Sequence, residues 1–217
     1  MHSLEIDGIQ LQYGQRKILR DVYLRCDTGQ TIGLLGRNGE GKSSLMKIAF
    51  GTTELEDYSV RIDGKNIKPA YRYPLGVAYL PQHHFIPSGI TIQKAFDFYQ
   101  LSFDAFAKEL PELHGRQKST IAALSGGIRR MVEIYIIIKK KGLFVMLDEP
   151  FTHIMPLYIE FIAQWINEEK ASKGFIISDH LYESVLPLCN QIYLLKDGKT
   201  HLCKKREDLV QHEYLSH

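Results

Sequence analysis

The stretch GRNGEGKSS, from Gly36 to Ser44, has the residue types and spacing of a phosphate-binding loop. It matches the pattern G-x-x-x-x-G-K-[ST], and it lies between a short apolar run and a predicted helix. Its glycines allow backbone N–H groups to turn inward around a phosphate, and the helix N-terminus adds partial positive charge. Lys42 can reach the β- and γ-phosphates of a nucleotide, and the Ser43 hydroxyl can bind Mg²⁺.

Two adjacent acids, Asp148 and Glu149, follow the apolar run LFVML. A phosphate-binding loop needs an acid at the end of a second buried strand to orient Mg²⁺, directly or through water. Glu149 lies one residue further along, where a carboxylate can polarise an attacking water. We therefore predict that Asp148 serves the metal and that Glu149 serves the water.

A second phosphate-binding device is predicted in LSGGIRR, from Leu124 to Arg130. Ser125 can cap a helix, while Gly126 and Gly127 leave N–H groups exposed at its positive end. In isolation these residues could form a simple helix N-cap. Because one phosphate-binding loop holds one nucleotide, the phosphate for this second device should come from a second copy of the chain.

These residues must be positioned by alternating strands and helices. Strands are predicted over 31–36, 76–82, 143–147, 174–178 and 191–195, and helices over about 41–50, 126–140 and 157–170 and near 181–188. This alternation predicts an α/β fold with a mostly parallel sheet and helices on both faces. The stretches 3–13 and 18–26 alternate apolar and polar residues and predict two antiparallel strands, and Asp63-Gly64 predicts a hairpin turn.

Residues 88–123 have helical spacing and no strand signal. We therefore expect a core over about 1–81 and 124–217 and a small helical subdomain over about 82–123. The subdomain carries several aromatic residues, and a few left exposed would form a contact patch for a partner. These residues are Phe85, Phe96, Phe98, Tyr99, Phe103 and Phe106.

Composition restricts the possible functions without choosing one. The chain has 217 residues, of which 44% are hydrophobic and 24% charged, and its net charge of +2 gives no argument for nucleic acid or an anionic membrane. The three cysteines, Cys26, Cys189 and Cys203, fit neither a disulfide framework nor a zinc site, and reduced thiols in a cytoplasmic protein are expected. No apolar run approaches the ~20 residues that span a bilayer, so at a membrane another chain should supply the spanning part.

Taken together, the motifs resemble those of the ATP-binding cassette (ABC) ATPase family over nearly the whole chain. GRNGEGKSS resembles its Walker A motif, LFVMLDE its Walker B motif and LSGGIRR its signature. Gln82 resembles the Q-loop glutamine, His180 the switch histidine and Tyr13 the aromatic residue that stacks on adenine. Within the family, YLPQ, LDEPF and the spacing around His180 look most like the cassettes of lipopolysaccharide export and branched-chain amino acid uptake.

The resemblance implies a P-loop NTPase fold that binds ATP and Mg²⁺ and hydrolyses ATP. Glu149, His180 and Gln82 would be catalytic, and Ser43, Gln82 and Asp148 would hold the metal. The nucleotide would be bound by Tyr13, Gly36, Arg37, Asn38, Gly39, Glu40, Gly41, Lys42, Ser43 and Ser44, and by Ser125, Gly126 and Gly127 of the opposite protomer.

Three departures from the family pattern stand out. Ile128 follows the signature where Gln or Glu is common, and the next helix reads EIYIIIKKK. Met155 occupies the place of the D-loop aspartate that links the two ATP sites of a dimer. A thioether cannot replace a carboxylate as a hydrogen-bond acceptor, although Thr152 and His153 could supply substitute polar contacts. We therefore expect near-normal ATP binding with slow and weakly cooperative hydrolysis.

The resemblance implies the ATP-binding subunit of an ABC transporter, peripheral on the inner face of the cell membrane. It would form a head-to-tail homodimer or heterodimer and drive transmembrane permease subunits, with no direct contact to nucleic acid. The alternatives are a soluble ABC ATPase acting on nucleic acid or ribosomes, and a degenerate cassette that binds ATP without turnover. The adjacent His83 and His84 are expected to be surface or partner-facing residues, not metal ligands.

Overall fold

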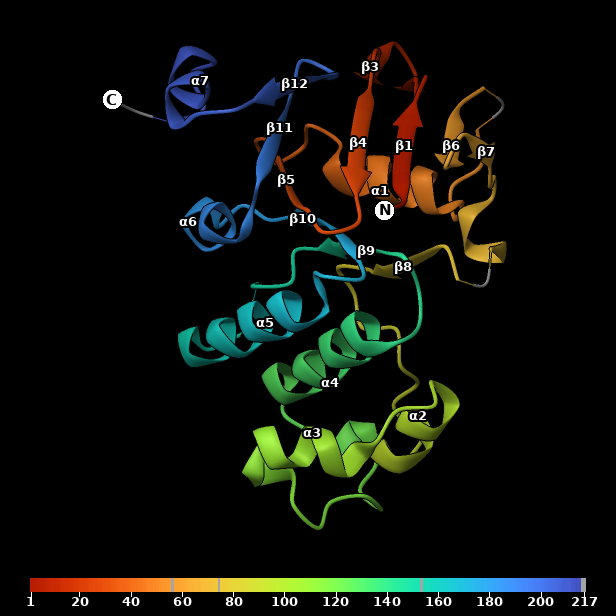
Figure 1. Cartoon of the computed structure of the whole chain (residues 1–217), viewed down its shortest axis with the longest axis vertical. Helices are drawn as coiled ribbons and strands as arrows, with labels where there is room; N and C mark the ends of the chain where they lie inside the picture. Colours follow the sequence, from red (N-terminus) through yellow and green to blue (C-terminus); the bar gives the residue numbers. More distant parts are fainter. Residues whose placement is uncertain (56, 74, 153, 216–217) are drawn as a thin grey trace.

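The elements of the chain stack in layers along its longest axis (Figure 1). The computed structural model describes residues 1–55, 57–73, 75–152 and 154–215. An antiparallel sheet lies at one end, a mostly parallel sheet in the middle, and helices at the other end. The predicted α/β fold with an N-terminal antiparallel part is therefore confirmed.

The central sheet has six strands among the described residues, in the order β12-β11-β5-β10-β9-β8. They are β5 (Thr31–Leu35), β8 (Val77–Leu80), β9 (Phe144–Asp148), β10 (Gly174–Ser178), β11 (Gln191–Lys196) and β12 (Lys199–Cys203). All pairs are parallel except β11 with β12. The carboxyl ends of the parallel strands consequently meet at one edge, where Gly36 and Asp148 lie.

Strands β5, β8, β9 and β10 are mostly apolar and are buried along their whole length, because both faces of the sheet are covered. In β9, Phe144 and Met146 join the core between the two sheets, and Val145 and Leu147 join the core on the opposite face. Helix α1 (Lys42–Phe50) packs in the first core. Helices α4 (Gly126–Lys139), α5 (Pro156–Glu169) and α6 (Tyr182–Val185) cover the other face, as predicted.

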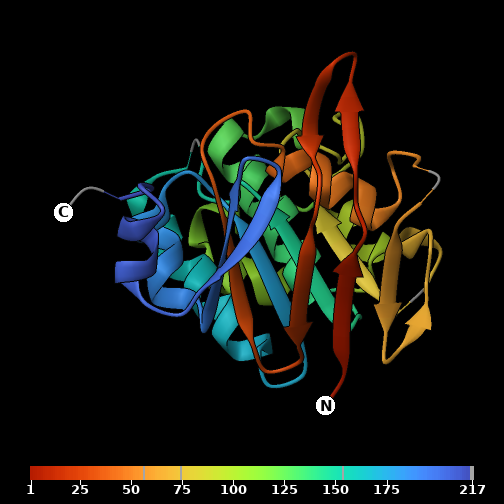
Figure 2. The ribbon, with the colours of Figure 1, turned by 90° about the horizontal axis from the view of Figure 1, so that it is seen from above.

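The N-terminal region differs from the prediction of two long strands. Each stretch forms two strands in different sheets: β1 (Ser3–Asp7) and β2 (Leu11–Tyr13), then β3 (Arg16–Leu19) and β4 (Tyr23–Asp27). The first break falls at Gly8, which has a φ of 69° that side chains disfavour. As a result β1 and β4 pair beside β6 (Ser59–Ile62) and β7 (Lys65–Asn66), while the β2–β3 hairpin projects from the molecule (Figure 2). The turn predicted at Asp63-Gly64 joins β6 to β7.

The segment between β8 and α4 is helical, with α2 (Ile92–Phe98), α3 (Phe103–Glu109) and 3₁₀ turns at Pro111–Leu113 and Ile121–Ala123. Thr91 and Ser102 cap the two α-helices with their hydroxyl oxygens. Phe96, Phe103 and Phe106 are buried, whereas the side chain of Phe98 is 79% exposed. Phe85 and Tyr99 are half-buried.

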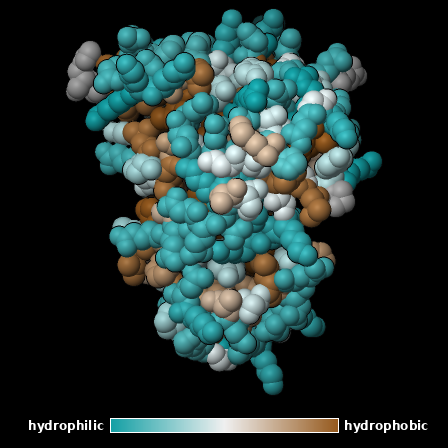
Figure 3. Space-filling model, in the orientation of Figure 1, coloured by the Kyte–Doolittle hydropathy of each residue, from teal (hydrophilic) through white to brown (hydrophobic). Residues whose placement is uncertain are grey.

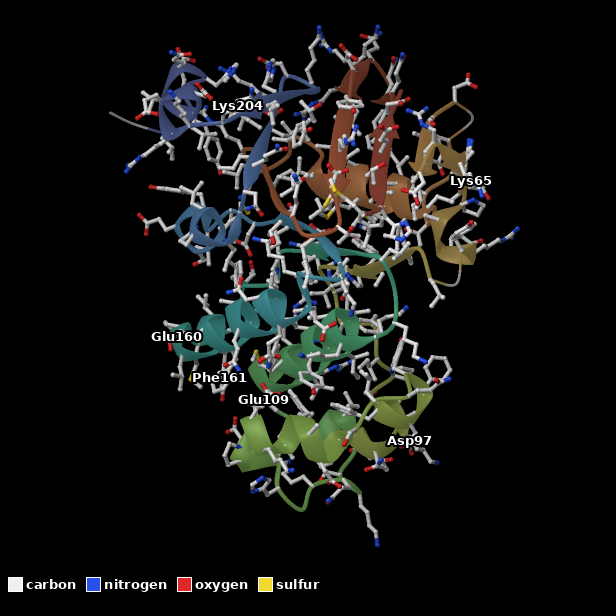
Figure 4. All side chains as sticks on the ribbon, in the orientation of Figure 1. Lys65, Asp97, Glu109, Glu160, Phe161 and Lys204 are labelled. Atoms are coloured by element: carbon white, nitrogen blue, oxygen red, sulfur yellow. The ribbon has the colours of Figure 1, made fainter. Side chains whose placement is uncertain are left out.

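Helix α3 is attached to α5. Glu109, labelled in Figure 4 beneath the residues Glu160 and Phe161 of α5, accepts a hydrogen bond from the Trp165 indole. Glu112 accepts a second bond from the Tyr158 hydroxyl at 2.7 Å. The helical segment is therefore fastened to α5 by two charge-assisted bonds.

The C-terminal part of the chain contains a strand and a helix that the sequence analysis did not predict. After β11 the chain forms β12 and helix α7 (Arg206–Gln211), which lie beside β11 at the edge of the molecule (Figure 1). Lys204, labelled in Figure 4, lies between them. The face in Figure 3 is largely hydrophilic, with apolar residues in scattered groups. No described helix is both long and apolar enough to cross a bilayer.

Candidate nucleotide site

The glycine-rich loop joins β5 to α1 at the carboxyl edge of the central sheet. A Cβ on Gly36 would lie 2.6 Å from the Leu195 carbonyl oxygen, and one on Gly41 would lie 2.7 Å from Ile18. Gly41 is the N-cap residue of α1 and has no side chain to cap the helix, and the first turn of α1 carries no acid. The N–H groups at this helix end are consequently left for an anionic ligand.

Lys42 is bound to the loop itself. Its Nζ donates to the carbonyl oxygen of Gly36 at 2.7 Å and of Arg37 at 3.2 Å, and the residue is only 6% exposed. Burial lowers the pKa of Lys42, and the nearby carboxylates of Glu149 and Asp148 oppose this shift. A phosphate would give this ammonium group a stronger partner than two carbonyl oxygens do.

Asp148 is fully buried and holds two hydroxyl groups. Ser43 Oγ donates to its Oδ1 at 3.0 Å, and the Tyr79 hydroxyl donates to its Oδ2 at 3.0 Å. Burial raises the pKa of Asp148, and these two hydrogen bonds oppose the shift. Ser43 and Asp148 thus present adjacent hard oxygen atoms beside the loop, which suits Mg²⁺.

The Oε2 atom of Glu149 accepts hydrogen bonds from two side chains and lies near a third. Gln82 Nε2 donates to it at 2.8 Å, Thr152 Oγ1 at 3.4 Å, and His180 Nδ1 lies 4.0 Å away. Glu149 has a φ of 50°, unusual for a residue with a side chain, and its N–H donates to the Ser178 carbonyl oxygen at 2.7 Å. The backbone bond therefore holds a left-handed conformation that directs the carboxylate toward the loop.

These groups surround one open cavity of about 440 Å³. It is lined by Tyr13, Ile18, Asn38, Gly39, Gly41, Lys42, Ser43, Ser44, Gln82, Glu149 and His180. The structure thus gathers most of the predicted site residues around a single space, with the exposed ring of Tyr13 at one side and the carboxylate of Glu149 at another.

Several predicted residues lie outside this lining. The Arg37 side chain donates to the Glu213 carbonyl oxygen at 3.0 Å and so points to the turn after α7, whereas Glu40 accepts from the Asp197 N–H at 3.1 Å in the turn between β11 and β12. Ser125 caps α4 by accepting from the Ile128 N–H at 3.4 Å. Gly126 and Gly127 line a different cavity, of about 480 Å³, on the other side of Gln82.

Three charged residues that the sequence analysis did not select support the site. Arg130 is 5% exposed and donates to the carbonyl oxygens of Pro81, Asp148 and Glu149. Asp179 accepts from the N–H groups of Phe151 and Leu181 and so joins the segments that follow Glu149 and His180. In the sequence, only the position of Arg130 near LSGG and that of Asp179 next to His180 could have indicated these roles.

The third is Glu133, which is fully buried in α4 and binds the segment after Gln82. It accepts from the N–H groups of Phe85 and Ile86 and lies 2.9 Å from His84 Nδ1. His84 therefore contacts a structural carboxylate, and His83 is exposed. No group of three or more His, Cys, Asp or Glu residues in the described part of the chain could hold a metal ion.

The comparisons with known proteins agree with this arrangement. The model of the family described as "ABC transporter" matches residues 19–152, more than half of the chain. A "Probable ABC transporter ATP-binding protein" of Azorhizobium caulinodans is 31% identical over 96% of this chain and 79% of its own length. The chain belongs to the ABC transporter family.

Further relatives give the same family. The "Lipopolysaccharide export system ATP-binding protein LptB" of Escherichia coli K12 is 27% identical, covering 99% of this chain and 95% of the relative. A solved "Structure of ATP binding subunit of ABC transporter" superposes with a TM-score of 0.81 at 25% identity, covering 97% of this chain and 93% of that one. The resemblance read from the motifs is thus confirmed, and so is the resemblance to lipopolysaccharide-export cassettes.

Proposed function

We propose that this chain binds ATP with Mg²⁺ and hydrolyses it as the energising subunit of a membrane transporter. The observation that carries the proposal is the 3.0 Å bond between Ser43 and Asp148, beside the uncapped start of α1 and in reach of Glu149. Two remote motifs meet there in the arrangement that phosphoryl transfer needs. The names of the relatives support the transporter assignment.

Each group has a separate task in this proposal. Lys42 leaves the carbonyl oxygens of Gly36 and Arg37 and binds the β- and γ-phosphates. Ser43 and Asp148, with Gln82, would hold Mg²⁺, and the bound ion would supply positive charge to offset the charge of the phosphoryl group. Glu149 takes a proton from the attacking water, and His180 holds the γ-phosphate.

The signature residues are proposed to act in a second copy of the chain. Ser125 and Gly126 are exposed and lie outside the cavity that holds Lys42 and Glu149. The helix end that they form can therefore close over ATP bound to another protomer, in a head-to-tail homodimer or a heterodimer with another cassette.

The helical segment 82–123 is the proposed contact with the permease subunits. Phe98 is 79% exposed at the end of α2, and its ring contacts Tyr99 edge-on at 5.0 Å. On Tyr99, the residue next to Phe98, the ring lies 5.8 Å from Lys140 Nζ. An exposed apolar ring and a cation that contact the same tyrosine suit a partner with both apolar and acidic residues. The chain would then work on the inner face of the cell membrane.

The proposal is tested by equilibrium binding of ATP with Mg²⁺ and by phosphate release. Lys42→Ala should abolish tight binding and turnover, because the β/γ-phosphates lose their cation. Lys65→Ala, at an exposed lysine of β7 labelled in Figure 4, is the matched control and should bind as the wild type does. An unchanged affinity for ATP in Lys42→Ala would contradict the assignment of this loop as the ATP site.

A further inference from the structure

Tyr79 of β8 lies on the same face of the central sheet as Asp148. Tyr79 pairs with Met146 of the neighbouring strand β9, and side chains two apart on a strand point to the same face, so Asp148 follows Met146 on that side. Tyr79 and Met146 both belong to the core between the two sheets, where α1 also packs. The Tyr79 hydroxyl therefore reaches forward along β9 to the carboxylate that follows its strand partner.

The side chain of Tyr79 is itself held in place by packing. It is only 8% exposed, and its ring lies against that of Phe50, with centroids 5.3 Å apart and planes at 42°. Phe50 is the last residue of α1, the helix that carries Ser43 in its first turn. Both side-chain partners of Asp148 thus depend on α1, since Ser43 belongs to this helix and Tyr79 packs against its end.

The two oxygen atoms of the Asp148 carboxylate have different surroundings. Oδ1 accepts from Ser43 Oγ at 3.0 Å, and Ser43 lines the nucleotide cavity, so Oδ1 is turned toward that cavity. Oδ2 accepts from the Tyr79 hydroxyl at 3.0 Å, on the side of the core. Because Asp148 is fully buried, bulk water does not replace either donor.

This difference matters when Ser43 turns to Mg²⁺, as the proposed function requires. A hydroxyl whose oxygen binds the metal no longer has to donate to Oδ1. Rotation of an aspartate carboxylate about its Cβ–Cγ bond has only a weak intrinsic preference, so hydrogen-bond partners set its orientation. The Tyr79 hydroxyl is then the side-chain donor that continues to hold the carboxylate.

We infer that Tyr79 is a positioning residue for the metal: its hydroxyl fixes Oδ2 of Asp148 and thereby keeps Oδ1 turned toward the nucleotide cavity. The inference rests on the proposed function, since it concerns the same site. Tyr79 acts through Asp148 and not on the nucleotide. Its hydroxyl consequently contributes to the affinity for ATP with Mg²⁺ and not to the affinity for ATP alone.

The test compares the Kd for ATP in EDTA with the Kd in excess Mg²⁺, because the ratio of the two isolates what the metal adds to binding. Tyr79→Phe keeps the ring and removes the hydroxyl, so this ratio should fall by roughly tenfold, the lower end of what a hydrogen bond to a charged group contributes. The Kd in EDTA should stay within about twofold of the wild-type value, since the bond removed does not involve the phosphate-binding loop. The Mg²⁺ concentration for half-maximal phosphate release should rise by a factor similar to the fall in the ratio.

Tyr158→Phe is the matched control. Tyr158 is 5% exposed and donates to the Glu112 carboxylate at 2.7 Å, so the same substitution removes the same kind of bond from α5, on the other face of the sheet. Its ratio should equal that of the wild type. Phe50→Leu is a second test, because it removes the ring against which Tyr79 packs but keeps the hydroxyl. Its ratio should fall by roughly twofold, the lower end of what an aromatic pair contributes.

The outcomes distinguish this inference from the proposed function. A wild-type protein that does not bind ATP, or whose affinity for ATP is the same in Mg²⁺ and in EDTA, would overturn both. A wild type whose affinity rises with Mg²⁺, with the same ratio in Tyr79→Phe as in Tyr158→Phe, would overturn the positioning role alone. Equal weakening of both Kd values in Tyr79→Phe would also overturn it, because a purely structural role of the hydroxyl predicts that result.

Discussion

The side-chain amide of Gln82 donates a hydrogen bond to the carboxylate of Glu149 at 2.8 Å. Gln82 lies in the segment after β8 and Glu149 directly after β9, and the bond is made to the same oxygen atom that accepts from the Thr152 hydroxyl. In the proposed reaction Glu149 must accept a proton from water. Gln82 therefore has to leave this oxygen when it turns to Mg²⁺ or the water, which links release of Glu149 to arrival of the nucleotide.

Glu133 should be one of the most sensitive positions for stability. Its buried carboxylate accepts the N–H groups of Phe85 and Ile86 and lies near Arg129 and Arg130. Glu133→Ala would leave these buried donors and cations without their acceptor, so we expect a loss of about 3–5 kcal/mol of unfolding free energy. Denaturant unfolding measures it.

The matched control is Glu168→Ala, which breaks the more exposed ion pair with Lys139 and should cost less than about 1 kcal/mol. Equal losses in the two variants would contradict the role given to Glu133 in joining α4 to the Gln82 segment.

The C-terminal end should be sensitive to acid through His201. Burial lowers the pKa of His201 below its ordinary value of 6.5, helped by the neighbouring His212, Lys199 and Lys196 and opposed by Asp197. The folded protein therefore binds this proton less well than the unfolded chain does. Its contribution to stability is full above pH 6.5 and is lost as the pH falls through the lowered folded-state pKa.

The unfolding temperature of His201→Gln should accordingly differ less between pH 8 and pH 5 than that of the wild type. The rings of His201 and His212 are 4.6 Å apart, so the neutral replacement removes one cation from this pair at low pH. His83→Gln, at an exposed histidine, should leave the wild-type pH dependence in place. The same acid sensitivity in His201→Gln as in the wild type would exclude His201 as its source.

Part of this architecture could be predicted because it is encoded locally. The glycine-rich loop, Asp148 and Glu149 are marked by short spacings after apolar runs, and the parallel sheet follows from strands that alternate with helices. The sequence analysis expected a few of the six aromatic residues to be exposed without saying which; Phe96 is buried and Phe98 exposed because residues two apart in a helix point to different sides.

The contacts missed by sequence analysis are long-range. Arg37 and Glu213 are 176 positions apart, and nothing in the sequence around either residue indicates the other.

Two elements were missed for local reasons. The edge strand β12 pairs with β11 alone in the central sheet and carries an exposed Leu202, so its alternation of apolar and polar residues is weak. Gly8 divides a stretch whose alternation continues on both sides of it, which is why one long strand was predicted where two exist.

Met155 should weaken coupling between two ATP sites. Its side chain is 56% exposed, directly before α5, and provides no cap for that helix. Thr152 is engaged with Glu149, and His153 lies outside the described residues, so neither is a demonstrated substitute for an acid. Met155→Asp should raise the rate of ATP hydrolysis or its Hill coefficient, with little change in affinity.

An aspartate at this position would also cap α5, which adds about 1 kcal/mol of stability by itself. Met155→Asn provides the same cap without the charge and is the control for that effect. The coupling argument fails if Met155→Asp leaves rate and Hill coefficient unchanged, or if the wild type is already fast and cooperative.

The most direct test of the account is phosphate release from ATP by Glu149→Gln, measured beside nucleotide binding and the size of the complex. The glutamine keeps the shape of Glu149 but cannot take a proton from water, so turnover should fall by roughly 10²- to 10⁴-fold. ATP should still bind, because Lys42 and Ser43 are untouched, and an ATP-locked dimer should accumulate on a sizing column. Wild-type turnover in Glu149→Gln would contradict the central claim that this carboxylate activates the water in an ATP-hydrolysing site.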